Sequence, residues 1–355
     1  MDRQKGSRRV MEGVKAAHDG MKSSPRKKFK KPESKPFDAA AMAEGVRSGS
    51  RLHLGKAITL LESANPMDKN NGQELLNRLL PYTGKSIRLG ITGVPGAGKS
   101  TFIETFGEML TKDGHRVAVL AIDPSSSITG GSILGDKTRM EQLAKNPNAF
   151  IRPSPTAGTL GGVHKKTRET MLLCEAAGYD IVLIETVGVG QSETLVRGMV
   201  DMFLLLVLTG AGDELQGMKK GILELADAII VHKADQHNLA LAQKTVREYK
   251  QILHFMQRAT EGWKTQALSA SSFEKTGIQE TWAMIKEFEE QIKASGYWQK
   301  RRQSQTKDWF RSMITDELLS RFYEDPSRRE QVKGLEQEVL QEKLTVSQAI
   351  ADLFE

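Results

Sequence analysis

The chain has 355 residues, of which 39% are hydrophobic and 27% are charged, and its mean hydropathy is −0.41. This composition can form the cores of about two domains, and the absence of a long uninterrupted apolar run excludes a membrane-spanning helix. A single cysteine, Cys174, excludes a disulfide framework and any metal site built from clustered cysteines. We therefore expect a reduced, soluble protein of the cytoplasm that does not act in a membrane.

The formal net charge of +7 is concentrated in the first 36 residues. These contain twelve Lys or Arg against four Asp or Glu, a charge of +8, which leaves −1 for residues 37–355. Their few apolar residues follow no period, so we predict a disordered basic tail over residues 1–36. The run Arg26–Lys31 would suit RNA or an anionic surface, but a solvated tail is the favoured interpretation, and we expect no nucleic acid partner.

An α/β region is predicted between two helical extensions. Residues 37–85 are predicted to form an N-terminal helical segment of two helices, with apolar residues at helical spacing in Leu52–Leu61 and in Leu75–Leu80. Residues 86–290 alternate helical patterns with continuous apolar runs, which are typical of parallel strands buried on both faces. The predicted strands are Ile87–Ile91, Val117–Ile122, Ile181–Ile184, Met202–Leu208 and Ala228–Val231, and two of the helical stretches are Thr101–Lys112 and Lys165–Ala177. Residues 291–355 are helical again, with an interruption at Pro326.

A phosphate-binding loop is the clearest functional motif. Residues 93–100 read Gly-Val-Pro-Gly-Ala-Gly-Lys-Ser, which fits the P-loop pattern G-x-x-x-x-G-K-[ST] between a predicted strand and a predicted helix. The glycines allow backbone N–H groups to point at phosphate oxygens, and the amino end of the following helix adds positive potential. We expect Lys99 to reach the β- and γ-phosphates and Ser100 to bind Mg²⁺.

The base is predicted from the residues after the fifth predicted strand. GTPases carry Asn-Lys-x-Asp there, and this chain reads His232-Lys233-Ala234-Asp235. The carboxylate of Asp235 can accept hydrogen bonds from guanine N1–H and N2–H₂, a pair that adenine does not offer. A neutral His232 is expected to donate one hydrogen bond but not to supply both an amide donor and a carbonyl acceptor, as Asn does. This would weaken GTP binding by about 1–2 kcal/mol, with the choice of guanine retained through Asp235. The alternative is a neutral change at a solvated edge. The predicted nucleotide-binding residues are Gly93, Val94, Pro95, Gly96, Ala97, Gly98, Lys99, Ser100, Thr101, His232, Lys233, Asp235 and the Ser-Ala loop Ser269, Ala270 and Ser271.

Acidic residues near the ends of predicted strands are candidates for the metal site. Glu185 ends the strand where P-loop proteins place an acid on the Mg²⁺ side, and a capping role is its alternative. Asp123 follows another strand, and Asp136 lies in a Gly-rich segment typical of a switch loop, with a helix N-cap as its alternative. The predicted metal ligands are therefore Ser100, Asp123, Asp136 and Glu185, and the predicted catalytic residues are Lys99, Asp136 and Glu185.

Hydrolysis by the chain alone is expected to be slow. Most GTPases place a water-orienting Gln after the glycine that follows the strand, and this chain has Val189 there. A valine side chain cannot orient a water molecule. Gln191 or a partner protein would have to contribute.

Several long blocks resemble the MeaB/ArgK/MMAA family of P-loop GTPases, which belongs to the SIMIBI class. The similarity extends from near Ala40 to the C-terminus, while the basic tail and His232 depart from the family pattern. The blocks that carry it are the P-loop residues 93–101, Asp123–Ser126, Gly130–Met140, Ile151–Pro155, Gly158–Val163, Glu185–Glu193 and Gly210–Gly217.

The resemblance implies a chaperone of an adenosylcobalamin-dependent acyl-CoA mutase, usually methylmalonyl-CoA mutase. Members of the family use GTP and Mg²⁺ to gate cofactor delivery and to protect the mutase, and they are homodimers. By this resemblance residues 86–290 are a GTPase domain and residues 291–355 a dimerisation arm. It also makes residues 210–221 a third switch, with Asp213, Glu214, Gln216, Lys219 and Lys220 as candidate partner contacts.

Other function classes stay open. One is a kinase that phosphorylates a periplasmic transport protein, an older label of the family, although no Asp dedicated to activating a hydroxyl group is evident. Another is a non-catalytic scaffold that binds nucleotide poorly, because His232 replaces the usual Asn. A third hypothesis, a GTPase that acts on RNA, is supported only by the basic tail.

Overall fold

The computed structural model describes residues 37–63, 65–122, 140–153, 160–186, 192–209 and 220–355. The chain divides into two units, Met1–Phe37 and Asp38–Glu355, and the helices and strands below belong to the second. The predicted basic tail, residues 1–36, lies outside the described residues.

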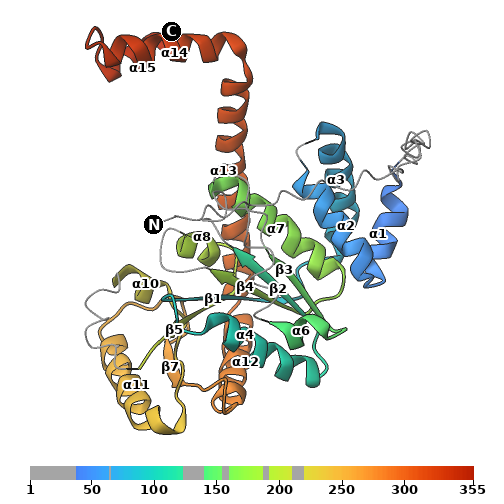
Figure 1. The fold of residues 1–355 in the computed structure, drawn as a ribbon, viewed down its shortest axis with the longest axis vertical. Coiled ribbons are helices and arrows are strands. Elements are labelled where there is room, and N and C mark those ends of the chain that lie inside the picture. The colour runs from blue at the N-terminus through green and yellow to red at the C-terminus, as the bar shows by residue number, and fades with distance from the viewer. Residues whose placement is uncertain (1–36, 64, 123–139, 154–159, 187–191, 210–219) are drawn as a thin grey trace, which may run out of the picture. The chain divides into compact units, whose positions relative to one another are not determined.

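A seven-stranded, wholly parallel sheet forms the centre of this unit (Figure 1). The order of the strands is β3-β2-β4-β1-β5-β6-β7, which confirms the doubly wound α/β class. Five strands were predicted, and the two that were not lie at the edges of the sheet, where polar residues interrupt the apolar run. The strands are β1 (Ile87–Gly93), β2 (Val117–Ile122), β3 (Ala149–Pro153), β4 (Ile181–Thr186), β5 (Met202–Val207), β6 (Ala228–Val231) and β7 (Gln266–Ser269).

Helices cover both faces of the sheet. On one face α4 (Lys99–Lys112), α6 (Glu141–Lys145) and α12 (Ile278–Ala294) bury Phe102, Leu143 and Ile285 against the strands. On the other face α10 (Lys220–Leu225) and α11 (Leu239–His254) form a second core with β5, β6 and β7. The short helix α8 (Ser192–Arg197) and the longer α7 (Leu160–Ala176) complete the second face. The apolar runs of the strands are continuous because both faces are covered.

Three helices, rather than the two predicted, form the N-terminal extension. They are α1 (Ala39–Arg47), α2 (Arg51–Glu62) and α3 (Pro66–Leu79), and a 3₁₀ turn at Leu80–Tyr82 follows. The first was missed because it buries only two alanines and one valine. The carboxylate of Asp38 caps it, since it accepts hydrogen bonds from the N–H groups of Ala40 and Ala41 at 3.0 and 2.9 Å. α2 and α3 pack on α7.

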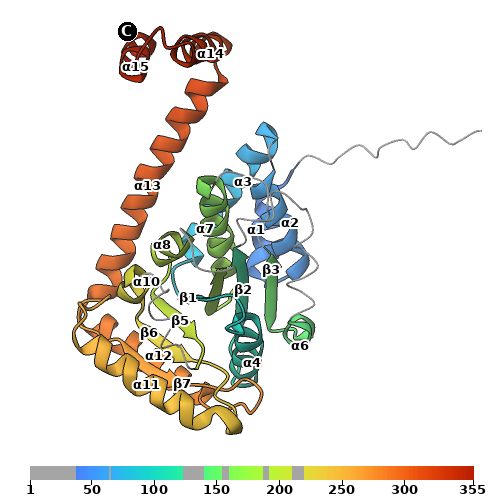
Figure 2. The ribbon, with the colours of Figure 1, turned by 60° about the vertical axis from the view of Figure 1, so that its left-hand side comes forward.

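Three helices form the C-terminal extension, as Figure 2 shows: α13 (Tyr297–Glu324), α14 (Pro326–Leu340) and α15 (Val346–Phe354). The predicted interruption at Pro326 is the first residue of α14, a position that suits proline, and Asp325 caps it. Gln305 is the one residue of α13 that is buried. In the described part of the chain, no helix combines the length and the apolar character needed to cross a membrane.

Candidate functional site

The residues predicted to bind the nucleotide, where the structure describes them, lie at one edge of the sheet. The P-loop follows β1, Glu185 lies near the end of β4, and His232 and Ser271 follow β6 and β7. Because parallel strands all end at the same edge, residues far apart in the sequence are brought together there (Figure 1).

The backbone of the P-loop depends on its glycines. Gly96 and Gly98 have φ values of 82° and 85°, in the left-handed region that favours glycine. At Gly93 an added Cβ would lie 2.3 Å from the carbonyl oxygen of Leu206 on β5, so no other residue fits there. Among the described residues no side chain caps the amino end of α4, whose first-turn N–H groups are suited to bind a phosphate instead. Thr101 lies exposed in this turn.

Lys99 and Ser100 are held by groups of the loop and the sheet. The Lys99 ammonium donates to the carbonyl oxygens of Gly93 at 2.8 Å and Val94 at 3.3 Å, which places this buried charge within the loop. The Ser100 hydroxyl donates to Glu185 Oε1 at 2.9 Å, so two of the four predicted metal ligands lie side by side.

This pair fits a Mg²⁺ ion. Mg²⁺ binds oxygen ligands, keeps several waters, and is commonly held by one or two protein groups together with substrate phosphates. Within the ranges that the structure describes, no three His, Cys, Asp or Glu side chains cluster so as to hold a metal alone. The phosphates and water would therefore supply the remaining ligands.

His232 joins the P-loop to the loop after β7, which corrects the expectation from the sequence. Its ring is buried, with Nδ1 2.7 Å from the carbonyl oxygen of Ala97 and Nε2 2.7 Å from Ser272 Oγ. Because Ala97 offers only an acceptor, Nδ1 carries the proton and donates, and Nε2 accepts from the hydroxyl. The imidazole therefore makes two hydrogen bonds, one as donor and one as acceptor, where the sequence analysis expects it to donate one.

Burial keeps the His232 ring neutral. It lowers the pKa of the imidazole below its usual value, and the neighbouring charge of Lys233 acts in the same direction. The ring meets Phe102 edge to face, and a Cβ added to Gly98 would lie 2.7 Å from Nδ1. His232 is thus a close-packed interior residue and not a solvated edge.

Asp235 is fixed in place by the predicted Ser-Ala loop. Ser271 Oγ donates to Asp235 Oδ1 at 2.5 Å, and the N–H of Ala234 donates to the carbonyl oxygen of Ala270 at 3.1 Å. Lys233 has φ 58°, an unusual value for a residue with a side chain, which sets the turn between β6 and Asp235. Ser269 ends β7 and leads into the same loop. The structure therefore brings together all the predicted base-side residues.

Some predicted residues fall where the structure gives no description. Asp123, Asp136, Asp213, Glu214, Gln216 and Lys219, together with Val189 and Gln191, lie outside the described residues. Lys220 is the first residue of α10, and its side chain is not described. The predicted third switch and half of the predicted metal ligands thus stay predictions.

Sequence reasoning missed three residues that hold the base side of the site. Ser272 is the partner of His232, Glu274 accepts from the Gln236 N–H at 2.8 Å, and Asn238 donates to Thr209 Oγ1 at 2.6 Å. The sequence did offer a signal for Ser272, because it directly follows Ser271 of the predicted Ser-Ala loop. Nothing in the sequence marks the other two, because their partners lie in other loops.

Similarity to known proteins identifies the family. The family model described as Methylmalonyl Co-A mutase-associated GTPase MeaB matches residues 54–327. The chain belongs to the MeaB family of GTPases. GTPase ArgK of Escherichia coli is 48% identical over 290 residues, which cover 81% of this chain and 88% of ArgK. The Methylmalonic aciduria type A homolog, mitochondrial, of Mus musculus is 47% identical over 320 residues, which cover 87% of this chain and 77% of that protein.

A solved structure, that of a protein named LAO/AO transport system kinase, has the same fold. It is 38% identical, covers 89% of this chain and 96% of its own, and superimposes with a TM-score of 0.72. The family and the fold agree: this MeaB-family member is a P-loop GTPase.

Proposed function

We propose that this GTPase is a nucleotide-driven chaperone of an adenosylcobalamin-dependent acyl-CoA mutase, with methylmalonyl-CoA mutase as the first candidate. In this proposal, bound GTP lets it gate the loading of the cofactor and protect the mutase from inactivation. The observation that carries the proposal is the family match over residues 54–327, since the family is defined by its association with that mutase.

The site geometry supports a partner-dependent GTPase. Lys99 lies within the P-loop, Ser100 lies beside Glu185, and Ser271 lies beside Asp235, which supports the predicted phosphate, metal and base contacts. In the sequence, Val189 occupies the position where most GTPases carry a water-orienting Gln. The mutase would then complete the hydrolytic site, as partners of other GTPases do. Mg²⁺ bound by Ser100 and Glu185 would neutralise phosphate charge.

The test is GTP hydrolysis by the full chain, alone and with methylmalonyl-CoA mutase. We expect slow turnover alone and a rise in kcat with the mutase of about ten-fold at least; partner effects in other GTPases reach about 10³–10⁵-fold. Lys99→Ala should abolish both rates. Loading of adenosylcobalamin onto the apo-mutase is measured in parallel with GTP and with GDP. An unchanged kcat together with equal loading in both nucleotide states would contradict the proposal.

The hydrogen bonds of His232 argue against the scaffold alternative. The kinase alternative is not supported by the residues of the site. Both ring nitrogens of His232 have hydrogen-bond partners, so the loops beside the predicted base site are still joined although His replaces Asn. One related structure is named a transport system kinase, but the sequence shows no Asp dedicated to activating a substrate hydroxyl. Transfer of labelled phosphate from GTP to a protein substrate would reopen this alternative.

We also infer that the chain acts as a homodimer through its C-terminal helices. Large apolar side chains on α13–α15 are exposed to solvent in the single chain, and such patches mark interaction surfaces. They are Phe310, Ile314, Leu318, Leu319, Tyr323, Leu340, Val346, Ile350 and Phe354. Action in the cytoplasm stays a prediction.

A further inference from the structure

The two ends of the P-loop are attached to the end of β4. Thr92 comes directly before the first glycine of the loop, and Ser100 is the last residue of the loop. At the beginning of the loop, the Thr186 hydroxyl donates to Thr92 Oγ1 at 2.7 Å. At its end, the Ser100 hydroxyl donates to Glu185 Oε1 at 2.9 Å. Two consecutive residues of β4 therefore hold both ends of one loop.

These two contacts lie on opposite faces of the sheet. Glu185 and Thr186 are neighbours in an extended strand, so their side chains point to opposite faces. Ser100 meets Glu185 on the face that α4 covers, where the metal ion is predicted. The Thr92–Thr186 pair lies on the other face, so it can hold the two strands together without occupying a ligand position.

The threonine pair is a fully buried contact between neighbouring strands. Both side chains have no exposed surface. The pair lies one step beyond Ile91 and Glu185, which are partners in the parallel register of β1 and β4. It therefore continues this register up to the first residue of the P-loop. A hydroxyl that loses its partner at such a place stays unsatisfied, because water does not reach it.

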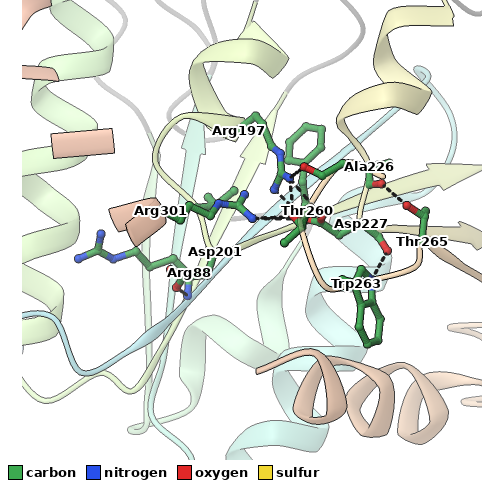
Figure 3. Close-up of polar contacts among 12 residues, drawn as sticks. Arg88, Arg197, Asp201, Ala226, Asp227, Thr260, Trp263, Thr265 and Arg301 are labelled. Atoms are coloured by element: carbon green, nitrogen blue, oxygen red, sulfur yellow. Dashed lines mark hydrogen bonds and ion pairs between the residues drawn. The ribbon is translucent and has the colours of Figure 1, made fainter. Parts of the chain in front are cut away.

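At the opposite edge, where the strands begin, charged groups join the strands instead. Asp227 precedes β6, accepts from the Phe203 N–H of β5 at 2.8 Å, and pairs with the Arg197 guanidinium at 2.6 Å (Figure 3). Asp201 precedes β5 and accepts from the Arg88 N–H of β1 at 2.8 Å. A further charge at the nucleotide edge would perturb the binding of phosphate or Mg²⁺, whereas two hydroxyls add no net charge. A neutral pair is therefore suited to the nucleotide edge.

We propose that Thr92 and Thr186 are positioning residues of the Mg²⁺ site. Their hydroxyl pair fixes the P-loop against β4, so that Ser100 and Glu185 keep the spacing at which both can bind one metal ion. Mg²⁺ demands near-ideal octahedral geometry, so a small change in this spacing lowers its affinity. The inference rests on the proposed metal site, and it does not depend on the mutase.

The experiment measures binding of a fluorescent GDP analogue to the full chain, with Mg²⁺ and with EDTA in its place. The ratio of the two dissociation constants reports how strongly metal and nucleotide reinforce each other. Thr186→Val keeps the shape of the side chain and loses the hydroxyl, and the ratio should fall by about three-fold or more, the scale of one hydrogen bond. Thr186→Ser keeps the hydroxyl and should restore the ratio.

Thr111→Val is the matched control. Thr111 is buried near the other end of α4, the helix that carries Ser100, and its hydroxyl donates to the carbonyl oxygen of Gly107 at 2.9 Å. This variant also loses a buried hydroxyl, but it should keep the Mg²⁺ ratio of the wild type.

The double variant Thr92→Val with Thr186→Val separates positioning from stability. Each single variant leaves one buried hydroxyl without its partner and should lower the melting temperature, whereas removal of both partners can be nearly neutral. We expect the double variant to regain most of the lost melting temperature but to keep the reduced Mg²⁺ ratio. The reason is that contacts between methyl groups are weak and non-directional, so they do not fix the register.

A Thr186→Val variant with the wild-type ratio would overturn this inference alone. So would a double variant in which the ratio and the melting temperature recover together, because the pair would then only support the fold. A wild type whose GDP affinity is the same with Mg²⁺ and with EDTA would overturn the metal site of Ser100 and Glu185 as well. If Thr186→Val does not fold, the double variant decides.

Discussion

At the scale of single residues, His232 shows how one side chain can take over a role with different atoms. The usual Asn offers an amide donor and a carbonyl acceptor, and the neutral imidazole offers one N–H and one ring nitrogen. In this structure each ring nitrogen has a partner at 2.7 Å, the carbonyl oxygen of Ala97 for Nδ1 and the hydroxyl of Ser272 for Nε2. His232 therefore joins the P-loop to the loop after β7.

Substitution of His232 tests this role directly. His232→Leu removes both hydrogen bonds and should weaken GDP binding by about ten-fold or more, since each bond contributes roughly 1 kcal/mol. His232→Asn should stay within about two-fold of the wild type, because the amide can make the same two contacts. Affinities are measured by titration with a fluorescent GDP analogue. A large gain in His232→Asn would instead show that histidine weakens the site, as the sequence alone had suggested.

The lowered pKa of His232 predicts a dependence of stability on pH. The folded protein binds the proton less readily than the unfolded chain, so this residue contributes no penalty above the unfolded pKa of about 6.5. As the pH falls below that value, stability is lost by at most about 1.4 kcal/mol per pH unit. Urea unfolding of nucleotide-free protein at pH 7.5 and 5.5 measures this loss. The loss should be smaller in His232→Asn, and equal losses would assign it to other groups.

At the scale of elements, glycines set how closely the helices approach the sheet. Gly90 lies in β1, directly under α8, and a Cβ there would lie 2.6 Å from the Phe203 ring. Gly55 lies within α2 with no heavy atom within 4 Å of an added Cβ. The same residue type thus meets a crowded surface in one case and open space in the other.

The two glycines predict opposite effects of one substitution. Gly90→Ala should lower the free energy of unfolding by about 1–3 kcal/mol, because the added methyl group overpacks the core. Gly55→Ala should raise it by about 0.4–1 kcal/mol, because alanine restricts the unfolded chain and favours the helix. Denaturant unfolding of both variants provides the comparison. The packing argument is wrong if Gly90→Ala is as stable as Gly55→Ala.

At the scale of the whole molecule, the C-terminal helices make few contacts within their own chain. Gln305 is the one buried residue of α13, and α14 has none. A helix of 28 residues with so little burial would be stabilised by the dimer interface that we infer, because helices in proteins gain most of their stability from packing. The exposed apolar residues of these helices would form that interface.

An acidic substitution on α13 tests the inferred dimer. Leu318 is 63% exposed, and Leu318→Asp should convert the protein to a monomer in light scattering coupled to size exclusion, because it places a charge in an apolar interface. Leu241→Asp is the matched control on α11, where the leucine is 41% exposed, and it should leave the mass unchanged. A wild type that is already monomeric would refute the dimer.

Much of the fold followed from local patterns. The five predicted strands were found because their apolar runs are continuous, and the P-loop because its glycines and Lys99 occur at a fixed spacing. β3 escaped prediction because Arg152 and Pro153 break its apolar run, and β7 because four residues carry too little pattern. The helix α1 escaped because alanine faces give a weak period.

By itself, the sequence determined the family resemblance that the comparisons bear out, and it predicted a phosphate-binding loop and the contact of Asp235 with guanine. Only the tertiary structure decided how these residues are connected. The pairing of His232 with Ser272 spans 40 positions, and the links from α13 to the end of α8 span more than 100. Such contacts depend on how strands are ordered in the sheet, and no local pattern of residues encodes that order.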